Sequence, residues 1–135
     1  MLTSINFLAI GIGAAAGAIS RWLLGLWLNH PGLLLPWGTL AANLVGGYLV
    51  GLLLGVLAMY PDAPTWLKLM LITGFLGGLT TFSTFSGETI GLLERGAYLS
   101  AFGYIGFSLA GSLALTCLGF ATASFVSSLG QAGSL

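Results

Sequence analysis

The residues best suited to chemistry lie in one polar segment of an otherwise apolar chain. Residues 74–88 read Gly-Phe-Leu-Gly-Gly-Leu-Thr-Thr-Phe-Ser-Thr-Phe-Ser-Gly-Glu. Paired glycines followed by two threonines form a continuous helix poorly, because glycine costs about 1 kcal/mol relative to alanine in a helix interior. At membrane depth a break is tolerated only where it is buried or lines an ion path. The segment therefore predicts a broken helix at an ion path or, alternatively, a glycine-rich packing crossover whose hydroxyls bond back to their own helix.

Hydroxyl and amide side chains form two further stripes at helical spacing. Thr39 and Asn43 are four residues apart in one stripe, and Tyr104, Ser108 and Ser112 repeat that spacing in the other. Each stripe alone is typical of hydrogen bonding between helices. Together with the break they supply neutral donors, which suit a small anion because O–H and N–H groups replace its water. A cation filter of carbonyls or an acidic ring has a different composition.

Four other side chains near these stripes have two readings each. Phe82 and Phe85 are three residues apart on one helix face, where they either pack in the core or turn their positive ring edges toward an anion. Arg21 near the end of the first apolar segment either extends to the membrane surface or draws anions into a vestibule. Glu88 is either a structural hydrogen-bond acceptor or a proton carrier, and its place beside an anion path favours the structural role.

The composition is that of an integral membrane protein. Only six of 135 residues are charged, the net charge is zero, 57% are hydrophobic and 22 are glycine. A soluble domain needs far more polar residues to cover its core, and a nucleic-acid binder needs a basic surface. The single His30 and single Cys117 form no cluster suited to metal or hydrolytic chemistry. Soluble domains, disordered linkers, nucleic-acid binders and enzymes are therefore excluded.

Hydropathy and turn signals divide the chain into four membrane-spanning helices within a single domain, residues 1–135. About 20 residues cross the ~30 Å hydrocarbon core, and the apolar segments meet that length. The predicted spans are 5–28, 39–59, 66–94 with the break inside it, and 98–126, followed by a short polar tail over 127–135. The connections are too short for an extramembrane domain, so the function must reside in the helices.

The charges give no preferred orientation in the membrane. With four spans, the N-terminal amine and Lys68 lie on one side, and Arg21 and Arg95 lie on the other. The positive-inside rule requires an asymmetry that these charges do not provide. One interpretation is that another signal fixes the orientation. The interpretation we favour is that the chain inserts both ways and pairs as an antiparallel, dual-topology homodimer in the lipid bilayer.

At these residues the sequence resembles the Fluc (CrcB) family of fluoride ion channels over the whole chain. The most specific element is the string Gly-Gly-Leu-Thr-Thr-Phe-Ser-Thr-Phe-Ser at residues 77–86. Two supporting elements are Gly-Thr-Leu-Ala-Ala-Asn at 38–43, followed by Gly46 and Gly47, and Gly-Ala-Ile-Ser-Arg at 17–21. Composition alone does not indicate fluoride.

The resemblance implies a multi-pass plasma-membrane channel for passive fluoride export, an antiparallel homodimer with two fluoride pathways. It implies that Phe82 and Phe85 are the pore phenylalanines and Asn43 the pore asparagine. The fourth-span donors are then Tyr104, Ser108 and Ser112, with Thr39 on the Asn43 stripe. It also implies a structural Na⁺ at the dimer interface, held by third-span backbone carbonyls that by position belong to Gly77 and Thr80.

Two other functions remain as alternatives. A proton-coupled small multidrug transporter is also a short four-span dimer, but its chemistry needs a first-span carboxylate. Here the first span carries Arg21 and no acid, while Glu88 lies in the third span. A structural subunit of a larger membrane complex is the other alternative, and it predicts no transport by the purified chain.

Overall fold

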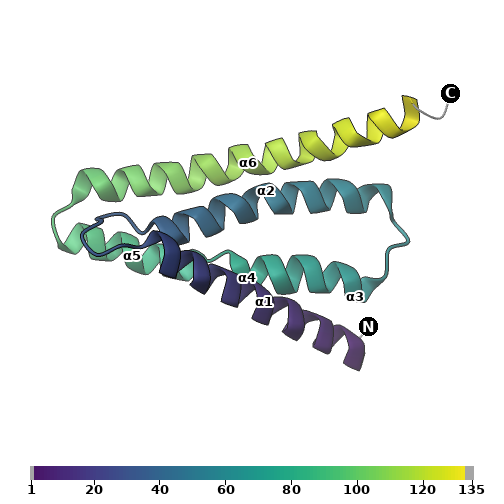
Figure 1. Ribbon diagram of the computed structural model, residues 1–135, viewed down its shortest axis with the longest axis horizontal. Helices are drawn as coiled ribbons and strands as arrows, with labels where there is room; N and C mark the ends of the chain where they lie inside the picture. The colour runs from purple at the N-terminus through teal and green to yellow at the C-terminus, as the bar shows by residue number, and fades with distance from the viewer. Residues whose placement is uncertain (1, 133–135) are drawn as a thin grey trace.

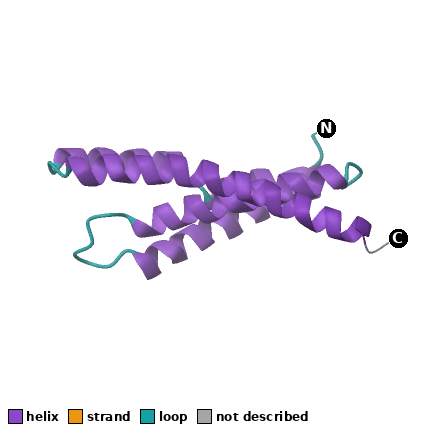
Figure 2. Ribbon diagram, turned by 90° about the horizontal axis from the view of Figure 1, so that it is seen from above, coloured by secondary structure: helices purple, strands orange, loops and turns teal. Residues whose placement is uncertain are grey.

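Four long apolar helices form the protein in the computed structural model, which describes residues 2–132. Figure 1 shows them packed roughly side by side along the long axis, and Figure 2 shows that the described residues are helices joined by loops. The elements are α1 (Ser4–Leu28), α2 (Trp37–Met59), α3 (Thr65–Lys68), η1 (Leu69–Leu76), α4 (Gly77–Leu79), α5 (Phe82–Glu94) and α6 (Tyr98–Ala132). Segments α3 to α5 together form the third span. The predicted fold class, four apolar helices with a break in the third, is confirmed.

The helix ends follow from local turn chemistry. The connection between α1 and α2 contains Pro31 and then Gly32 at φ 94°, a left-handed conformation that favours glycine. Gly96 at φ 73° likewise ends the turn after α5. The helix α6 continues to Ala132, so residues 127–132 are helical and not the polar tail expected from the sequence. Nothing in this stretch stops the helix, because Ser and Gln at its end are compatible with helical backbone.

The third span contains one feature that the sequence did not predict. Its first half, η1 (Leu69–Leu76), is a π-helix of eight residues that leads through α4 into the break. In a π-helix each hydrogen bond encloses one more residue than in an α-helix, and such segments are frequently found at functional sites. Hydropathy does not distinguish the two forms, since both can be uniformly apolar.

Glycine allows the helices to pack at short range. In the first span, a Cβ atom on Gly17 would overlap the Phe75 carbonyl oxygen. In the second span, a Cβ on Gly51 would overlap the Thr116 carbonyl oxygen. The small-residue spacing therefore marks real helix contacts, α1 with η1 and α2 with α6, which are the two most extensive in the chain.

The single chain has a thin core and an apolar exterior. One buried cluster contains Leu40, Phe85, Leu92, Ala101 and Tyr104, and a second contains Ala42, Leu76 and Leu79. Large apolar side chains are instead exposed along the helices, as in the 66% exposed Phe102 and the 72% exposed Phe107. Such a surface requires lipid or a partner of similar character.

Candidate functional site

The break in the third span is two residues of extended backbone. Thr80 has φ −84° and ψ 154°, and Thr81 has φ −153° and ψ 122°, between the end of α4 and the start of α5. Thr81 is the N-cap of α5, because its hydroxyl oxygen accepts a hydrogen bond from the Thr84 N–H at 3.1 Å. The Thr80 hydroxyl donates to the Leu76 carbonyl at 2.7 Å. The two threonines therefore belong to opposite sides of the break.

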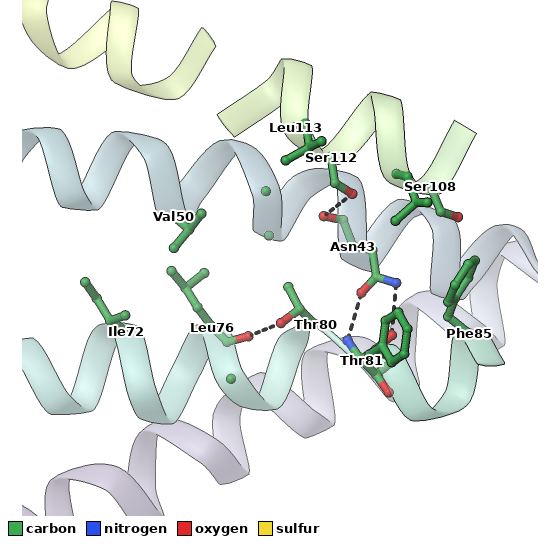
Figure 3. Close-up of a pocket in the computed structure, with 15 residues that line it drawn as sticks. Asn43, Val50, Ile72, Leu76, Thr80, Thr81, Phe85, Ser108, Ser112 and Leu113 are labelled. Carbon is green, nitrogen blue, oxygen red and sulfur yellow. Dashed lines mark hydrogen bonds between the residues drawn. The ribbon is translucent and has the colours of Figure 1, made fainter. Parts of the chain in front are cut away.

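Asn43 on α2 supplies the hydrogen bonds that the helix loses at this point. Its Oδ1 accepts from the Thr81 N–H at 2.8 Å, and its Nδ2 donates to the Thr81 carbonyl at 3.1 Å (Figure 3). A side-chain amide can pair with a peptide group in this two-bond manner because it carries both a donor and an acceptor. Asn43 thus holds the break open in addition to the pathway role expected from the sequence.

Two backbone carbonyls lose their helical hydrogen-bond partners because of these contacts. In a continuous α-helix the Thr81 N–H would bond the Gly77 carbonyl, and the Thr84 N–H would bond the Thr80 carbonyl. Here the first N–H bonds Asn43 and the second bonds the Thr81 hydroxyl. Gly77 is also exposed on the single chain, and Thr80 is half-buried. Released carbonyl oxygens at a helix break are the ligand type that Na⁺ takes in membrane proteins, so both residues fit the sodium site that the resemblance implies.

A cavity of about 510 Å³, here called the central cavity, lies beside the break between α2, the third span and α6. Its wall is mostly apolar, with the polar groups of Asn43, Ser108 and Ser112 among them (Figure 3). The Ser108 hydroxyl is buried and has no hydrogen-bond partner among the described residues. The Ser112 hydroxyl has a long contact of 3.5 Å with the Asn43 carbonyl. Because a buried hydroxyl normally finds a partner, the Ser108 hydroxyl is an unsatisfied polar group beside the central cavity.

Three aromatic rings continue from the central cavity toward one end of the bundle. The Phe82 and Phe85 ring centroids are 5.6 Å apart at 48°, and those of Phe85 and Tyr104 are 5.2 Å apart at 51°. Phe85 is buried, whereas Phe82 is 74% exposed on the single chain. Both phenylalanines line the central cavity. The rings are tilted, so each ring edge lies near a neighbouring face.

Glu88 connects the two polar stripes. Thr39 donates from its hydroxyl to Glu88 Oε1 at 2.8 Å, and Tyr104 donates from its hydroxyl to Glu88 Oε2 at 2.7 Å. Thr39 and Tyr104 therefore lie at the carboxylate and not in the wall of the central cavity, where Asn43, Ser108 and Ser112 lie. The structural acceptor role expected for Glu88 agrees with these contacts.

Arg21 contacts the other side of the break. Its Nε donates to the Gly78 carbonyl at 3.0 Å, a carbonyl that the Phe82 N–H would bond in a continuous helix. Arg21 is half-buried and does not line the central cavity. Its positive charge lies at the C-terminal end of α4, where a cation interacts favourably with the helix dipole. The sequence reading did not anticipate this contact.

Thr81 is the site residue that the sequence reading missed. Its backbone contacts Asn43, its hydroxyl caps α5, and it lines the central cavity. A Thr directly before a new helical segment is a recognised N-cap signal. The pair Thr80-Thr81 contained that signal, but the hydrogen-bond partner 38 residues away does not appear in any local pattern.

Asn43→Asp tests the two-bond contact with Thr81. The new carboxylate keeps an acceptor but loses the donor to the Thr81 carbonyl, and an unpaired buried group costs about 1–3 kcal/mol. We expect a lower melting temperature in detergent. It is measured by size-exclusion chromatography of samples heated to increasing temperatures. Asn29→Asp is the matched control, because Asn29 uses its Oδ1 to accept from the Gly38 N–H, which Asp preserves. Equal stability of the two variants would contradict the contact's importance.

Comparison with known proteins identifies the family. The family model described as CrcB-like protein, Camphor Resistance (CrcB), matches residues 8–120. The fluoride-specific ion channel FluC of Bordetella petrii is 63% identical over 122 residues, covering 90% of this chain and 94% of the relative. FluC of Bordetella avium is 63% identical over 123 residues, covering 91% and 96%, and FluC of Albidiferax ferrireducens is 56% identical over 127 residues, covering 93% and 96%. The chain belongs to the CrcB family.

Proposed function

We propose that this protein is a fluoride-selective ion channel that lets fluoride leave the cell passively across the plasma membrane. Its membership of the CrcB family and its similarity to proteins named fluoride-specific ion channels support this function. These relatives are channels and not enzymes. The structural observation that carries the proposal is the buried, unpartnered Ser108 hydroxyl in the wall of the central cavity. The multidrug transporter alternative receives no support from these relatives.

The pathway runs from the central cavity past the phenylalanines. Ser108 and Ser112 offer O–H donors, and the second N–H of the Asn43 amide offers another, so a small anion exchanges its water for neutral donors. Phe82 and Phe85 then provide ring edges, which carry partial positive charge. Thr39 and Tyr104 follow at Glu88, and Arg21 places a positive charge beside the break on the vestibule side.

The assembly in this proposal is an antiparallel homodimer. The balanced charges of the loops support insertion in both orientations. The 74% exposed Phe82 supports it as well, because a pore phenylalanine on the outside of one protomer needs a second protomer to enclose it. Two protomers paired in this way enclose two equivalent pathways.

A structural Na⁺ between the protomers completes the proposal. One protomer contributes the Gly77 and Thr80 carbonyls, whose helical partners bond elsewhere, and a two-fold partner contributes the same pair. Oxygen ligands from backbone need no acidic side chain. The bound ion would fix the two breaks against each other and neutralise the carbonyl dipoles at the interface.

The proposed function is tested by fluoride efflux from liposomes that contain only the purified protein. We expect rapid fluoride loss at a fluoride electrode and little chloride loss. Phe82→Ile should slow efflux about tenfold, because an aromatic contact of ~1.4 kcal/mol in the transition state corresponds to that factor. Phe125→Ile, at a residue that is also exposed and lies near the end of α6, is the control. No fluoride efflux from assembled wild-type protein would overturn the function.

Dual topology is tested by a reporter fused to the C-terminus. We expect the reporter on both sides of the membrane in comparable amounts, because no loop charge favours either orientation. Adding two Lys residues to the second loop, between residues 60 and 64, should shift the reporter to one side. A wild-type reporter found on one side only would contradict the antiparallel dimer.

The sodium proposal predicts sensitivity to prolonged Na⁺ removal. Dialysis against a buffer with a large organic cation should reduce fluoride efflux and weaken the dimer on size exclusion, because the released carbonyls would repel each other without a cation. Returning Na⁺ should restore both. Unchanged efflux and assembly after exhaustive dialysis would exclude a structural Na⁺.

A further inference from the structure

Arg21 belongs to a face of α1 that lies against the third span (Figure 1). Gly13, Gly17 and Arg21 follow one another at four-residue spacing, which puts them along one side of the helix. A Cβ atom on Gly13 would overlap the Met70 carbonyl oxygen, and a Cβ on Gly17 would overlap the Phe75 carbonyl oxygen. This side of α1 is therefore in backbone contact with η1, and Arg21 extends it to the end of α4.

Two consecutive glycines of α4 face opposite surroundings. A Cβ on Gly78 would overlap the Ala14 carbonyl oxygen of α1. A Cβ on Gly77 would lie 3.9 Å from the Ile72 carbonyl oxygen of the same span, and no described atom of α1 lies within 4 Å of that position. Because neighbouring residues of a helix are about 100° apart around its axis, one turn presents Gly78 to α1 and Gly77 to the exterior of the chain.

The last turn of α4 is poorly fixed by its own span. It follows the π-helical η1, contains the pair Gly77 and Gly78 without side chains, and ends at the extended Thr80. The final carbonyls of a helix have no partner within the helix. The Gly78 carbonyl is one of them, and it accepts a hydrogen bond from Arg21 Nε at 3.0 Å. This hydrogen bond fixes the turn to α1, 57 residues away in the sequence.

The Arg21 side chain contacts the backbone of the break and not the wall of the central cavity. It is half-buried, and it does not line that cavity. The atom that contacts Gly78 is Nε, the first nitrogen of the guanidinium group along the side chain. A charged donor makes a stronger hydrogen bond than a neutral one. The contact therefore needs a donor at one position of the side chain, and the positive charge strengthens it.

We propose that Arg21 is a positioning residue for the sodium site. Its hydrogen bond to the Gly78 carbonyl holds the last turn of α4 against α1, so that the neighbouring Gly77 and Thr80 carbonyls are presented together as ligands. The inference rests on the proposed structural Na⁺ and adds a residue that does not itself bind the ion. Without the donor the turn can move, and Na⁺ then binds more weakly although every proposed ligand is still present.

Two substitutions of Arg21 separate the hydrogen-bond donor from the charge. The side-chain amide nitrogen of glutamine is the same number of bonds from Cα as Nε of arginine, so Arg21→Gln removes the charge and keeps a donor at that position. Arg21→Met has a methyl group there and removes both the donor and the charge. A role through the backbone predicts a large effect of Arg21→Met and a small effect of Arg21→Gln. A role through charge alone predicts equal effects.

The readout is the melting temperature of dialysed protein as Na⁺ replaces a large organic cation at constant ionic strength. An ion that binds the folded protein raises its stability with concentration, so the Na⁺ concentration at half of the rise reports affinity. We expect Arg21→Met to need about tenfold more Na⁺ than the wild type, and Arg21→Gln about twofold more. The dimer fraction on size exclusion should follow the same order. Arg95→Met, at an exposed arginine after α5, is the matched control and should cause no shift.

The outcomes separate this inference from the proposed function, because fluoride efflux is not the readout. A wild-type melting temperature that does not respond to Na⁺ overturns the structural Na⁺ and the positioning role with it. With a responsive wild type, an unshifted Arg21→Met overturns the positioning role, even if its melting temperature is lower at every Na⁺ concentration. An Arg21→Gln that shifts by tenfold also overturns it, whether or not Arg21→Met assembles, because the charge and not the donor is then decisive.

Discussion

The two hydrogen bonds between Asn43 and the peptide groups of Thr81 are the contact on which the site depends. A broken helix in hydrocarbon must find new partners for the backbone groups that it releases, since each unpaired group costs several kcal/mol. Asn43 satisfies Thr81, Arg21 satisfies the Gly78 carbonyl, and the Thr81 hydroxyl satisfies the Thr84 N–H. The remaining carbonyls, at Gly77 and Thr80, are those proposed to hold Na⁺.

Close helix packing leaves the proposed pathway at the side of the chain and not through the middle of the bundle. Where Gly17 and Gly51 bring neighbouring backbones together, no space remains for a hydrated channel through the bundle. The central cavity lies instead beside the break, and Phe82 at its edge is largely exposed. The proposed fluoride pathway is therefore enclosed only if a second protomer covers this side. The proposed pathway and the proposed dimer depend on each other.

The sequence predicted the four helices and the break because both depend on local properties, hydropathy over about 20 residues and a Gly-Gly-x-Thr-Thr string. It did not predict the π-helical η1, since hydropathy is the same in both helix forms. It placed Thr39 and Tyr104 with the donors of the path but not on Glu88, because those contacts span 49 and 16 residues. The Arg21 contact spans 57 residues and has no local signal.

The distribution of charge along the proposed route has a physical reason. Conduction requires an ion to enter a path and also to leave it, so no single site can bind it too tightly. A fixed cation in the middle of the hydrocarbon would hold a small anion strongly, because Coulomb attraction grows as the dielectric constant falls. Here the wall of the central cavity carries hydroxyls, an amide and ring edges, and Arg21, which bonds the Gly78 carbonyl, is not part of that wall. Weak neutral contacts along this wall would allow both capture and release.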